Sequence, residues 1–275
     1  MPELSRRESC TGRFLDPANL LQTIPDHEKG FESTIHYKHV SQLISLQFSK
    51  ILQILHYELN NNLLYFTTWK KAKEHFMDKR KLDTLPVECC LAIITYTMDE
   101  KINGTKLYLD FNEKCRRLGD DGTWQSFPYK SLYALLTRSI HTITNNPDVT
   151  TPIYYRGLKC KITDIKEGDY VYSAQFLSCT TDKQVALEFI GGSDEDTQGT
   201  LMVFEGSAMA ACGIMDYSAF KEEQEILVFP WSTFKVTKII TGGSQDQIFL
   251  KTIGPFIATL PYSGTYIKKG VTIQN

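Results

Sequence analysis

The feature that most constrains the fold of this chain is a change in hydrophobic periodicity at residues 145–148, where Asn145, Asn146, Pro147 and Asp148 form a cluster of turn-forming residues. Before this cluster, apolar residues recur at steps of three and four, which is the spacing of an amphipathic helix. After it, short runs of β-branched and aromatic residues are separated by turn signals, which is typical of strands. Helices followed by strands predict an α+β fold, with an N-terminal helical part packed on a C-terminal, mainly antiparallel β-sandwich.

The same patterns predict the individual elements. Helices are expected over 40–59, 65–80, 87–98 and 131–143, with a further short helix around 185–189. Strands are expected over 153–155, 170–172, 201–204, 226–229, 234–240 and 248–253. The start of the chain is rich in proline and has little periodicity. The predicted organisation is therefore an irregular lead-in over 1–32, a helical subdomain over 33–148 and a β-sandwich core over 149–275.

The composition excludes several classes of protein. Hydrophobic residues make up 42% and charged residues 23% of the 275 residues, values of a globular chain rather than a disordered one. The net charge of -2 argues against a nucleic-acid-binding protein with a basic surface. No apolar run approaches the ~20 residues of a membrane-spanning helix. The seven cysteines form no C-x-x-C pair, so no metal site is expected.

The two ends of the sequence bear on location. The charged residues at the start are not followed by the apolar stretch of a secretory signal, and residues 268–275 lack the hydrophobic tail of a lipid-anchor signal. These patterns favour a cytoplasmic protein, or one that is secreted or injected without a classical signal peptide. Reduced cysteines are expected in that case.

Three places in the β-rich half carry residues that suit chemistry. Arg156 ends an apolar run and precedes Gly157, so its guanidinium could bind a phosphate while the glycine lets a ligand approach the backbone. A solvated arginine at a strand end is the alternative. Ser178 lies near the end of a strand, where its hydroxyl could orient a carboxylate or a sugar, whereas Thr180 or Thr181 suits the N-cap of the helix that follows.

The third place is the acidic run that contains Glu223 and Glu225, just before an aliphatic strand. In an extended chain these two carboxylates share a face, where one can stabilise developing positive charge while the other binds a cation. An acidic turn before a strand is the alternative. No histidine follows His141, which disfavours a Ser-His-Asp enzyme in this half, and no glycine-rich phosphate loop with its lysine is present.

In their order, these motifs resemble the R-S-E class of ADP-ribosyltransferases, in which an arginine at a strand end is followed by F-x-S-x-[ST] and then by E-x-E before an aliphatic strand. The matching residues are Arg156, the segment 176–180 and the segment 223–227. Segments 108–116 and 127–138 are similar to the Y-x-x-F-N-x-x-x-R and F-x-[FY]-K-x-L…L-L-T-R segments of the animal arginine-specific mono-ADP-ribosyltransferases. The usual S-T-S is Ser178-Cys179-Thr180 in this chain, with the first serine kept.

The resemblance implies an ADP-ribosyltransferase fold with an NAD cleft, NAD as a substrate and no metal. The implied reaction moves ADP-ribose from NAD to arginine side chains of a target protein and releases nicotinamide. By position, Arg156 would hold the NAD phosphates and Ser178 would position the nicotinamide ribose or Glu225. Glu225 would bind the ribose 2′-hydroxyl and stabilise an oxocarbenium-like transition state, as in glycosidases. Gly157 and Thr180 would belong to the same NAD site.

The resemblance also implies where the acceptor binds. Glu223 would orient the guanidinium of the target arginine, which is almost always charged before attack. Phe220, in the loop before the carboxylates, would contact the acceptor, and a loop residue folded onto the core is its alternative. Two other functions remain open at this point: an NAD glycohydrolase, for which water is the acceptor, and an inactive module of the same fold that binds other proteins.

Overall fold

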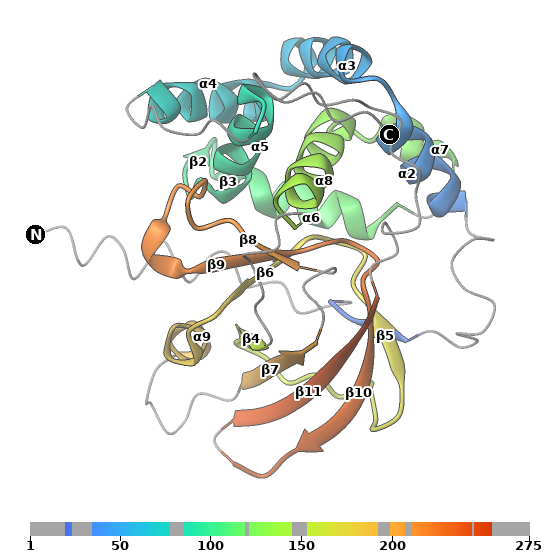
Figure 1. Ribbon diagram of the computed structural model, residues 1–275, viewed down its shortest axis with the longest axis vertical. Helices are drawn as coiled ribbons and strands as arrows, with labels where there is room; N and C mark the ends of the chain where they lie inside the picture. The colour runs from blue at the N-terminus through green and yellow to red at the C-terminus, as the bar shows by residue number, and fades with distance from the viewer. Residues whose placement is uncertain are drawn as a thin grey trace, which may run out of the picture.

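The computed structural model describes residues 20–23, 35–77, 85–118, 121–144, 153–191, 199–206, 211–243 and 245–254. Figure 1 shows two layers, with helices above and a strongly bent sheet below. The chain crosses from the helical layer to the sheet once its first seven labelled helices are complete, so the two layers follow each other along the sequence. This arrangement confirms the predicted α+β fold.

The helical layer is built from seven of the eight described helices. They are α2 (Ile35–Ser45), α3 (Phe48–Asn61), α4 (Leu63–Met77), α5 (Val87–Thr97), α6 (Leu107–Arg116), α7 (Asp121–Ser126) and α8 (Lys130–Thr144). Helix α9 (Lys183–Ile190) lies instead against the sheet. Helices α6 and α7 were not expected from the sequence periodicity.

The stripe predicted as one helix over 40–59 is divided into α2 and α3. Helix α2 ends at Ser45. After it, the amide of Leu46 donates a hydrogen bond to the carbonyl of Leu43, three residues earlier, instead of continuing the i→i−4 pattern of the helix. The buried guanidinium of Arg138, on α8, donates hydrogen bonds to the carbonyls of Ile44 and Leu46. These contacts satisfy carbonyls that a continuous helix would have used, which stabilises the break.

Helix α5 lies at the centre of the helical layer. Every residue from Cys89 to Thr97 is buried, which is typical of a helix that is covered on all sides. It packs in one apolar cluster, here called the helical core, which also contains Phe176, Leu227 and Phe229 from the sheet. The helical core therefore continues across the boundary between the two layers.

The sheet contains nine described strands in the order β1-β5-β10-β11-β7-β4-β6-β9-β8. Their bounds are β1 Gln22–Thr23, β4 Ile153–Leu158, β5 Tyr170–Tyr172, β6 Leu177–Thr180, β7 Gly199–Glu205, β8 Ala211–Gly213, β9 Glu225–Val228, β10 Thr233–Ile240 and β11 Gln245–Gly254. Neighbours pair antiparallel except β7 and β11, which are parallel. A separate hairpin joins β2 (Lys101–Ile102) and β3 (Thr105–Lys106).

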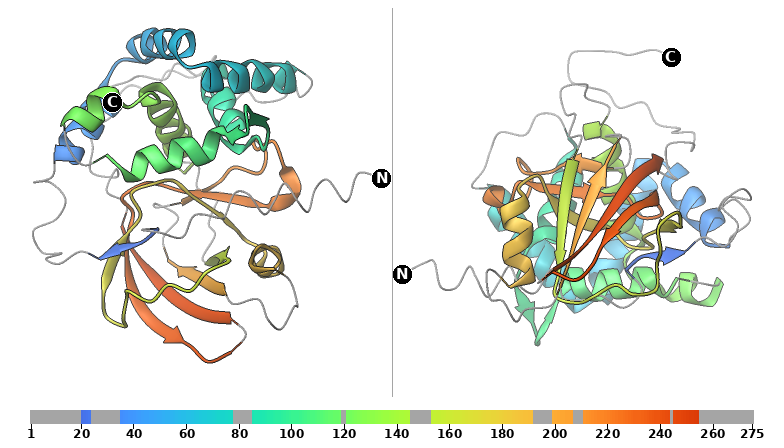
Figure 2. Two further views of the ribbon diagram at one scale, coloured as in Figure 1. Left: turned by 180° about the vertical axis from the view of Figure 1, so that it is seen from behind. Right: turned by 90° about the horizontal axis from the view of Figure 1, so that it is seen from below.

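The predicted sandwich is thus one continuous sheet that bends around an apolar cluster, here called the sheet core (Figure 2). Tyr154, Phe204 and Phe234 form its aromatic part, with ring centroids 4.9 and 5.1 Å apart. Strand β8 was not expected from the sequence, and β6 extends two residues beyond Ser178, near which the end of a strand was expected. Strand β1 lies within the range expected to be irregular, where it pairs with β5.

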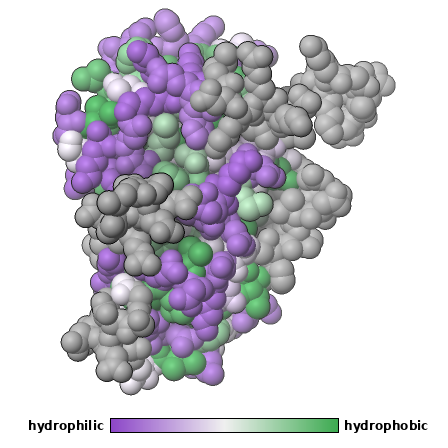
Figure 3. Space-filling view, turned by 90° about the vertical axis from the view of Figure 1, so that its left-hand side faces the viewer, coloured by the Kyte–Doolittle hydropathy of each residue, from purple (hydrophilic) through white to green (hydrophobic). Residues whose placement is uncertain are grey.

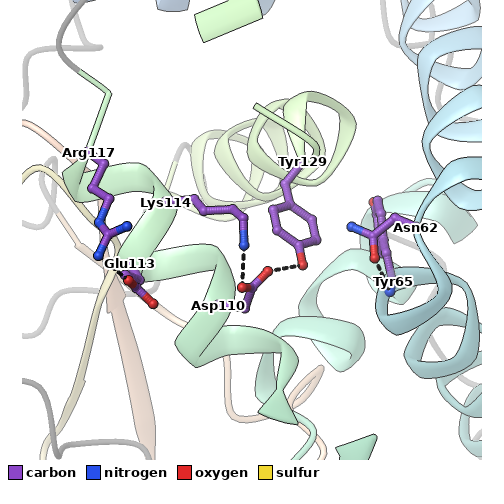
Figure 4. A network of polar contacts seen from close by, with 7 residues as sticks. All are labelled: Asn62, Tyr65, Asp110, Glu113, Lys114, Arg117 and Tyr129. Carbon is purple, nitrogen blue, oxygen red and sulfur yellow. Dashed lines mark hydrogen bonds and ion pairs between the residues drawn. The ribbon is translucent and has the colours of Figure 1, made fainter. Parts of the chain in front are cut away.

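A polar network joins α6 to the start of α8 (Figure 4). The carboxylate of Asp110 accepts hydrogen bonds from the ammonium of Lys114, one turn later, and from the hydroxyl of Tyr129. Burial raises the pKa of Tyr129, with the bond to Asp110 adding to the effect, so the hydroxyl stays protonated and acts as the donor. The network fixes α6 relative to α8 from the side away from the sheet.

Helix α9 approaches the sheet at two glycines. A Cβ on Gly157 of β4 would lie 1.9 Å from the carbonyl oxygen of Ala186, and a Cβ on Gly199 of β7 would lie 2.3 Å from the side chain of Ile190. Real Cβ atoms do not approach other atoms so closely. Glycine at both positions therefore lets α9 pack directly against the backbone of β4 and β7.

Candidate active site

Three neighbouring strands bring the predicted catalytic residues together. The sheet order places β6 between β4 and β9, so Arg156, Ser178 and Glu225 come from adjacent strands. In the register, Thr180 is opposite Tyr155 on one side and opposite Glu225 on the other. Residues that are 69 positions apart in sequence, Arg156 and Glu225, thereby belong to one compact site.

Side-chain alternation decides which way the serine and the glutamate point. On β6, Leu177 and Cys179 lie in the sheet core, so Ser178 between them points to the opposite face. On β9, Ile226 lies in the sheet core, so Glu225 before it also points to the opposite face. That face is covered by the helical layer, and the site therefore lies at the boundary between the two layers (Figure 1).

Hydrogen bonds link the three residues. Arg156, which lies on the same face of β4 as Tyr154 and Leu158 of the sheet core, reaches the backbone of Ser178 rather than its side chain. Nη1 of Arg156 donates to the backbone carbonyl of Ser178 over 2.6 Å. The hydroxyl of Ser178 donates to Oε1 of Glu225, and the hydroxyl of Ser218 donates to Oε2 over 3.0 Å. Arg156, Ser178 and Glu225 are only 3%, 5% and 2% exposed. Both carboxylate oxygens are thus held by hydroxyl groups in a nearly dry environment.

Burial dominates the electrostatics of the site. It lowers the pKa of Arg156, opposed by the nearby groups of Cys179, Tyr96 and Glu225. A guanidinium nevertheless stays protonated in proteins, so the strand next to that of Ser178 carries a fixed positive charge. Burial also raises the pKa of the Cys179 thiol to about 12, so this cysteine is a neutral packing residue rather than a nucleophile.

The helical layer adds residues that the sequence interpretation did not assign to the site. The hydroxyl of Tyr96, on α5, accepts a hydrogen bond of 3.1 Å from Asn112, on α6, and donates one of 3.4 Å to the carbonyl of Phe176. Arg116 donates to the side chain of Gln175, just before β6. Asn112 and Arg116 belong to the Y-x-x-F-N-x-x-x-R segment, and this motif could have indicated their place in the site. No sequence motif indicated Tyr96 or Ser218.

Two of the predicted NAD-binding residues, Gly157 and Thr180, make contacts that stabilise the region around α9. The backbone of Gly157 packs against the carbonyl of Ala186 in α9, so this glycine allows the helix to lie close to the sheet. The hydroxyl of Thr180 accepts a hydrogen bond of 3.1 Å from the amide of Asp182. Asp182, and not Thr180 or Thr181, is the N-cap of α9, since its carboxylate accepts from the amide of Gln184.

The segment before β9 is not extended as expected. Glu223 ends a 3₁₀ helix, η3 (Lys221–Glu223), and Gln224 adopts a left-handed conformation with φ of 46°. Because Gln224 turns the chain, the period-2 argument that placed Glu223 and Glu225 on one face does not apply. Glu223 is 9% exposed, and Phe220 immediately before η3 is half-buried. The left side of Figure 1, where η3 lies, is the mainly hydrophilic face of Figure 3.

Two further observations concern the described residues as a whole. No group of three or more His, Cys, Asp or Glu side chains in the described ranges is arranged to hold a metal ion. Within the same ranges, no helix has the length and apolar character required to cross a bilayer.

Comparison with known proteins identifies the family. The family model described as NAD:arginine ADP-ribosyltransferase matches residues 37–255. Ecto-ADP-ribosyltransferase 5 of Homo sapiens is 26% identical over 211 residues, which are 73% of this chain and 68% of the relative. The Erythroblast NAD(P)(+)--arginine ADP-ribosyltransferase of Gallus gallus is 27% identical over 192 residues, which are 68% of this chain and 59% of the relative. The chain thus spans less than two thirds of the latter protein.

A solved structure shows the same fold. A mutant of the eucaryotic mono-ADP-ribosyltransferase ART2.2 in complex with NADH superposes with a TM-score of 0.58 and 23% sequence identity. The match covers 74% of this chain and 83% of that one. The predicted ADP-ribosyltransferase fold is confirmed by this similarity.

The comparisons correct the location expected from the sequence. One relative is named as an ecto-enzyme, and another, from Mus musculus, as the GPI-linked NAD(P)(+)--arginine ADP-ribosyltransferase 1, which is 26% identical over 230 residues. These names point to the cell surface or to secretion, so the expectation of a cytoplasmic protein is wrong. The absence of recognisable end signals was not a reliable guide.

The family model covers most of the chain, from residue 37 to residue 255. The predicted family and its NAD-dependent, arginine-directed class of reaction are confirmed. This chain belongs to the NAD:arginine ADP-ribosyltransferase family.

Proposed function

We propose that this chain transfers ADP-ribose from NAD to an exposed arginine of a target protein, releasing nicotinamide, with Glu225 as the central catalytic residue. The observation that supports this most directly is the buried hydrogen-bonded set of Arg156, Ser178 and Glu225 on three adjacent strands. A carboxylate held on both oxygens suits a reaction in which positive charge develops on a sugar.

The proposed role of Glu225 follows from the charge of the transition state. Cleavage of the bond between nicotinamide and ribose passes through an oxocarbenium-like state. The carboxylate of Glu225 would accept a hydrogen bond from the ribose 2′-hydroxyl and stabilise that positive charge. Ser178 would keep the carboxylate in place, because its hydroxyl already donates to Oε1. A preorganised group gains catalytic effect because it need not reorient during the reaction.

Arg156 would bind the NAD phosphates while it keeps its hydrogen bond to the backbone of β6. A guanidinium has five N–H donors, so the bond to the Ser178 carbonyl is compatible with contacts to a phosphate. The neighbouring Gly157 and Thr180 would contribute backbone and hydroxyl groups to the same NAD site. Because Arg156 contacts the residue that holds Glu225, its substitution should affect both binding and turnover.

Glu223 and Phe220 would bind the acceptor. Glu223 ends the 3₁₀ helix η3 and Glu225 begins β9, and the left-handed Gln224 between them changes the direction of the chain. This arrangement suits two different tasks, with Glu225 serving the ribose and Glu223 the guanidinium of the target arginine. Phe220 would contact the aliphatic part of the same side chain.

A matched pair of neighbouring variants tests these assignments. The protein is incubated with labelled NAD and agmatine, and labelled agmatine and free ADP-ribose are measured separately. Glu225→Gln should reduce both products about 100- to 1000-fold, the usual cost of losing a preorganised catalytic group. Glu223→Gln should remove agmatine labelling but leave hydrolysis of NAD. Glu222→Gln, at the exposed adjacent carboxylate, is the control and should change neither product.

The outcomes separate the possible functions. Labelled agmatine from the wild-type protein identifies a transferase, and free ADP-ribose alone identifies an NAD glycohydrolase. If the folded protein neither cleaves nor binds NAD, as measured by calorimetry, the chain is an inactive member of its family. Equal loss of both products in Glu223→Gln would contradict the acceptor role of Glu223.

A further inference from the structure

The second oxygen of the catalytic carboxylate has a partner that no sequence motif indicated. Ser218 lies in the loop between β8 and η3, seven residues before Glu225, and is 1% exposed. Its hydroxyl donates to Oε2 of Glu225 over 3.0 Å and accepts a hydrogen bond of 3.2 Å from the amide of Phe220. This hydroxyl therefore contacts the catalytic carboxylate and the backbone of a proposed acceptor-binding residue.

The loop that carries Ser218 is tightly folded. The amides of Tyr217 and Ser218 both donate to the carbonyl of Ile214, over 2.9 and 2.8 Å. The amide of Ile214 donates in turn to the backbone carbonyl of Glu225 over 2.9 Å. The start of the loop is thus fixed to the strand residue that carries the carboxylate.

Helix α5 holds the loop from the other side. The hydroxyl of Thr97, the last residue of the helix, accepts a hydrogen bond of 2.9 Å from the amide of Ala219 and donates one of 3.2 Å to the carbonyl of Ile94. Thr97 is fully buried. Because Ala219 is adjacent to Ser218, the helical layer fixes the backbone from which the serine reaches Glu225.

From these contacts we infer that Ser218 is a second positioning residue for Glu225, that Thr97 holds it in place, and that the acceptor-binding loop and the catalytic carboxylate therefore act as one unit anchored to α5. The inference rests on the proposed function of Glu225. The hydrogen bond from Ser178 fixes only one oxygen of the carboxylate. With that bond alone, the second oxygen could still swing around the first. A second donor, from a different segment, removes this freedom.

Other groups near Glu225 do not replace Ser218. The charges of Arg156 on β4 and the polar groups of Tyr96 on α5 and Cys179 on β6 interact with the carboxylate through space. Such interactions depend mainly on distance and leave the orientation of the carboxylate less defined than a directed hydrogen bond does. Loss of Ser218 should thus change geometry more than charge.

Steady-state kinetics with NAD and agmatine separate positioning from general stability. Ser218→Ala should lower kcat about 10- to 100-fold, the range for a hydrogen bond to a charged group, while KM for NAD stays within about threefold. Ser218→Thr keeps the hydroxyl and should recover most of the lost kcat. Ser139→Ala removes a buried hydroxyl that donates to the carbonyls of Leu135 in α8 and of Cys89, which lies at the opposite end of α5 from Thr97, and should leave kcat unchanged. Unchanged kcat in Ser218→Ala, or an equal loss in Ser139→Ala, would overturn the inference.

Amide hydrogen exchange provides a readout that does not depend on activity. Thr97→Val should speed exchange at the amide of Ala219, and Ser218→Ala should speed exchange at the amide of Phe220, whereas Thr97→Ser should exchange as the wild-type protein does. Wild-type rates at both amides in the variants would contradict the anchoring by α5. If the wild-type protein has no activity toward NAD, the proposed function fails, and the exchange rates still decide whether the loop is anchored in this way.

Discussion

Replacement of Gly157 by alanine offers a sharp test of how α9 is packed and how that packing supports the site. The new Cβ would lie 1.9 Å from the carbonyl oxygen of Ala186 and 3.0 Å from Cγ1 of Ile190. An ordinary contact begins near 3.4 Å, so the helix or the strand must move by about 1.5 Å. The nearest atom belongs to the backbone, so no side-chain rotation can relieve the contact.

The expected cost follows from this displacement. Overpacking of a close-packed interior costs about 1–3 kcal/mol, and a backbone contact places Gly157→Ala at the upper end of that range. At about 2–4 °C per kcal/mol for a protein of this size, Tm should fall by roughly 6–12 °C. Arg156 precedes the shifted residue, so the Kd for NAD should also rise.

Thermal unfolding followed by circular dichroism measures the first effect, and calorimetric titration with NAD measures the second. Gly243→Ala is the matched control, because the same methyl group would meet no atom closer than 3.6 Å in the turn between β10 and β11. It should change Tm by no more than about 1 °C. If Gly157→Ala unfolds at the same temperature as the control, the packing argument is wrong.

Three further predictions concern other buried groups. Arg156→Lys should raise KM for NAD about 10-fold and lower kcat, because an ammonium cannot reproduce a planar two-pronged contact; unchanged values in the labelled-NAD assay would contradict the role of Arg156. Tyr129→Phe removes the donor to Asp110 and should lower the free energy of unfolding by about 1–3 kcal/mol, measured by urea denaturation. Burial raises the pKa of Glu58 above 4.5, against the effect of its bonds to Ser131 and Lys130. A carboxyl whose pKa rises on folding stabilises the folded state at acidic pH, so the advantage of the wild-type protein over Glu58→Gln should shrink as the pH rises from about 4 to about 8; an advantage that grows would refute this sign.

Much of the fold was predictable because the hydrophobic periodicity is strong. The ranges expected for α5 and α8 agree with the structure within one residue at each end, and β5 agrees at both. The break between α2 and α3 was not predictable, because the apolar stripe continues through it and the stabilising guanidinium of Arg138 comes from a helix about 90 residues later. Strand β8 was missed because its three residues, Ala211 to Gly213, lack the β-branched and aromatic signal.

The site was predictable only where the sequence contains a motif. Arg156, Ser178 and Glu225 were selected by their order along the chain, and the sheet brings them together. The expected relation of Glu223 to Glu225 failed because a single left-handed residue, Gln224, changes the direction of the chain. Ser218 and Thr97 carry no local pattern, since their roles depend on contacts between segments distant in sequence.

The order of strands also has a consequence for biosynthesis. Strand β6 pairs with β4, which is synthesised earlier, and with β9, which is synthesised later. Strand β7 pairs with β11, at the far end of the described chain, so this pairing also forms late in synthesis. A ribosome-bound polypeptide that ends before residue 225 lacks the carboxylate of Glu225. Such long-range pairing is slow to form, so this part of the sheet is completed only after β9 and β11 have been synthesised.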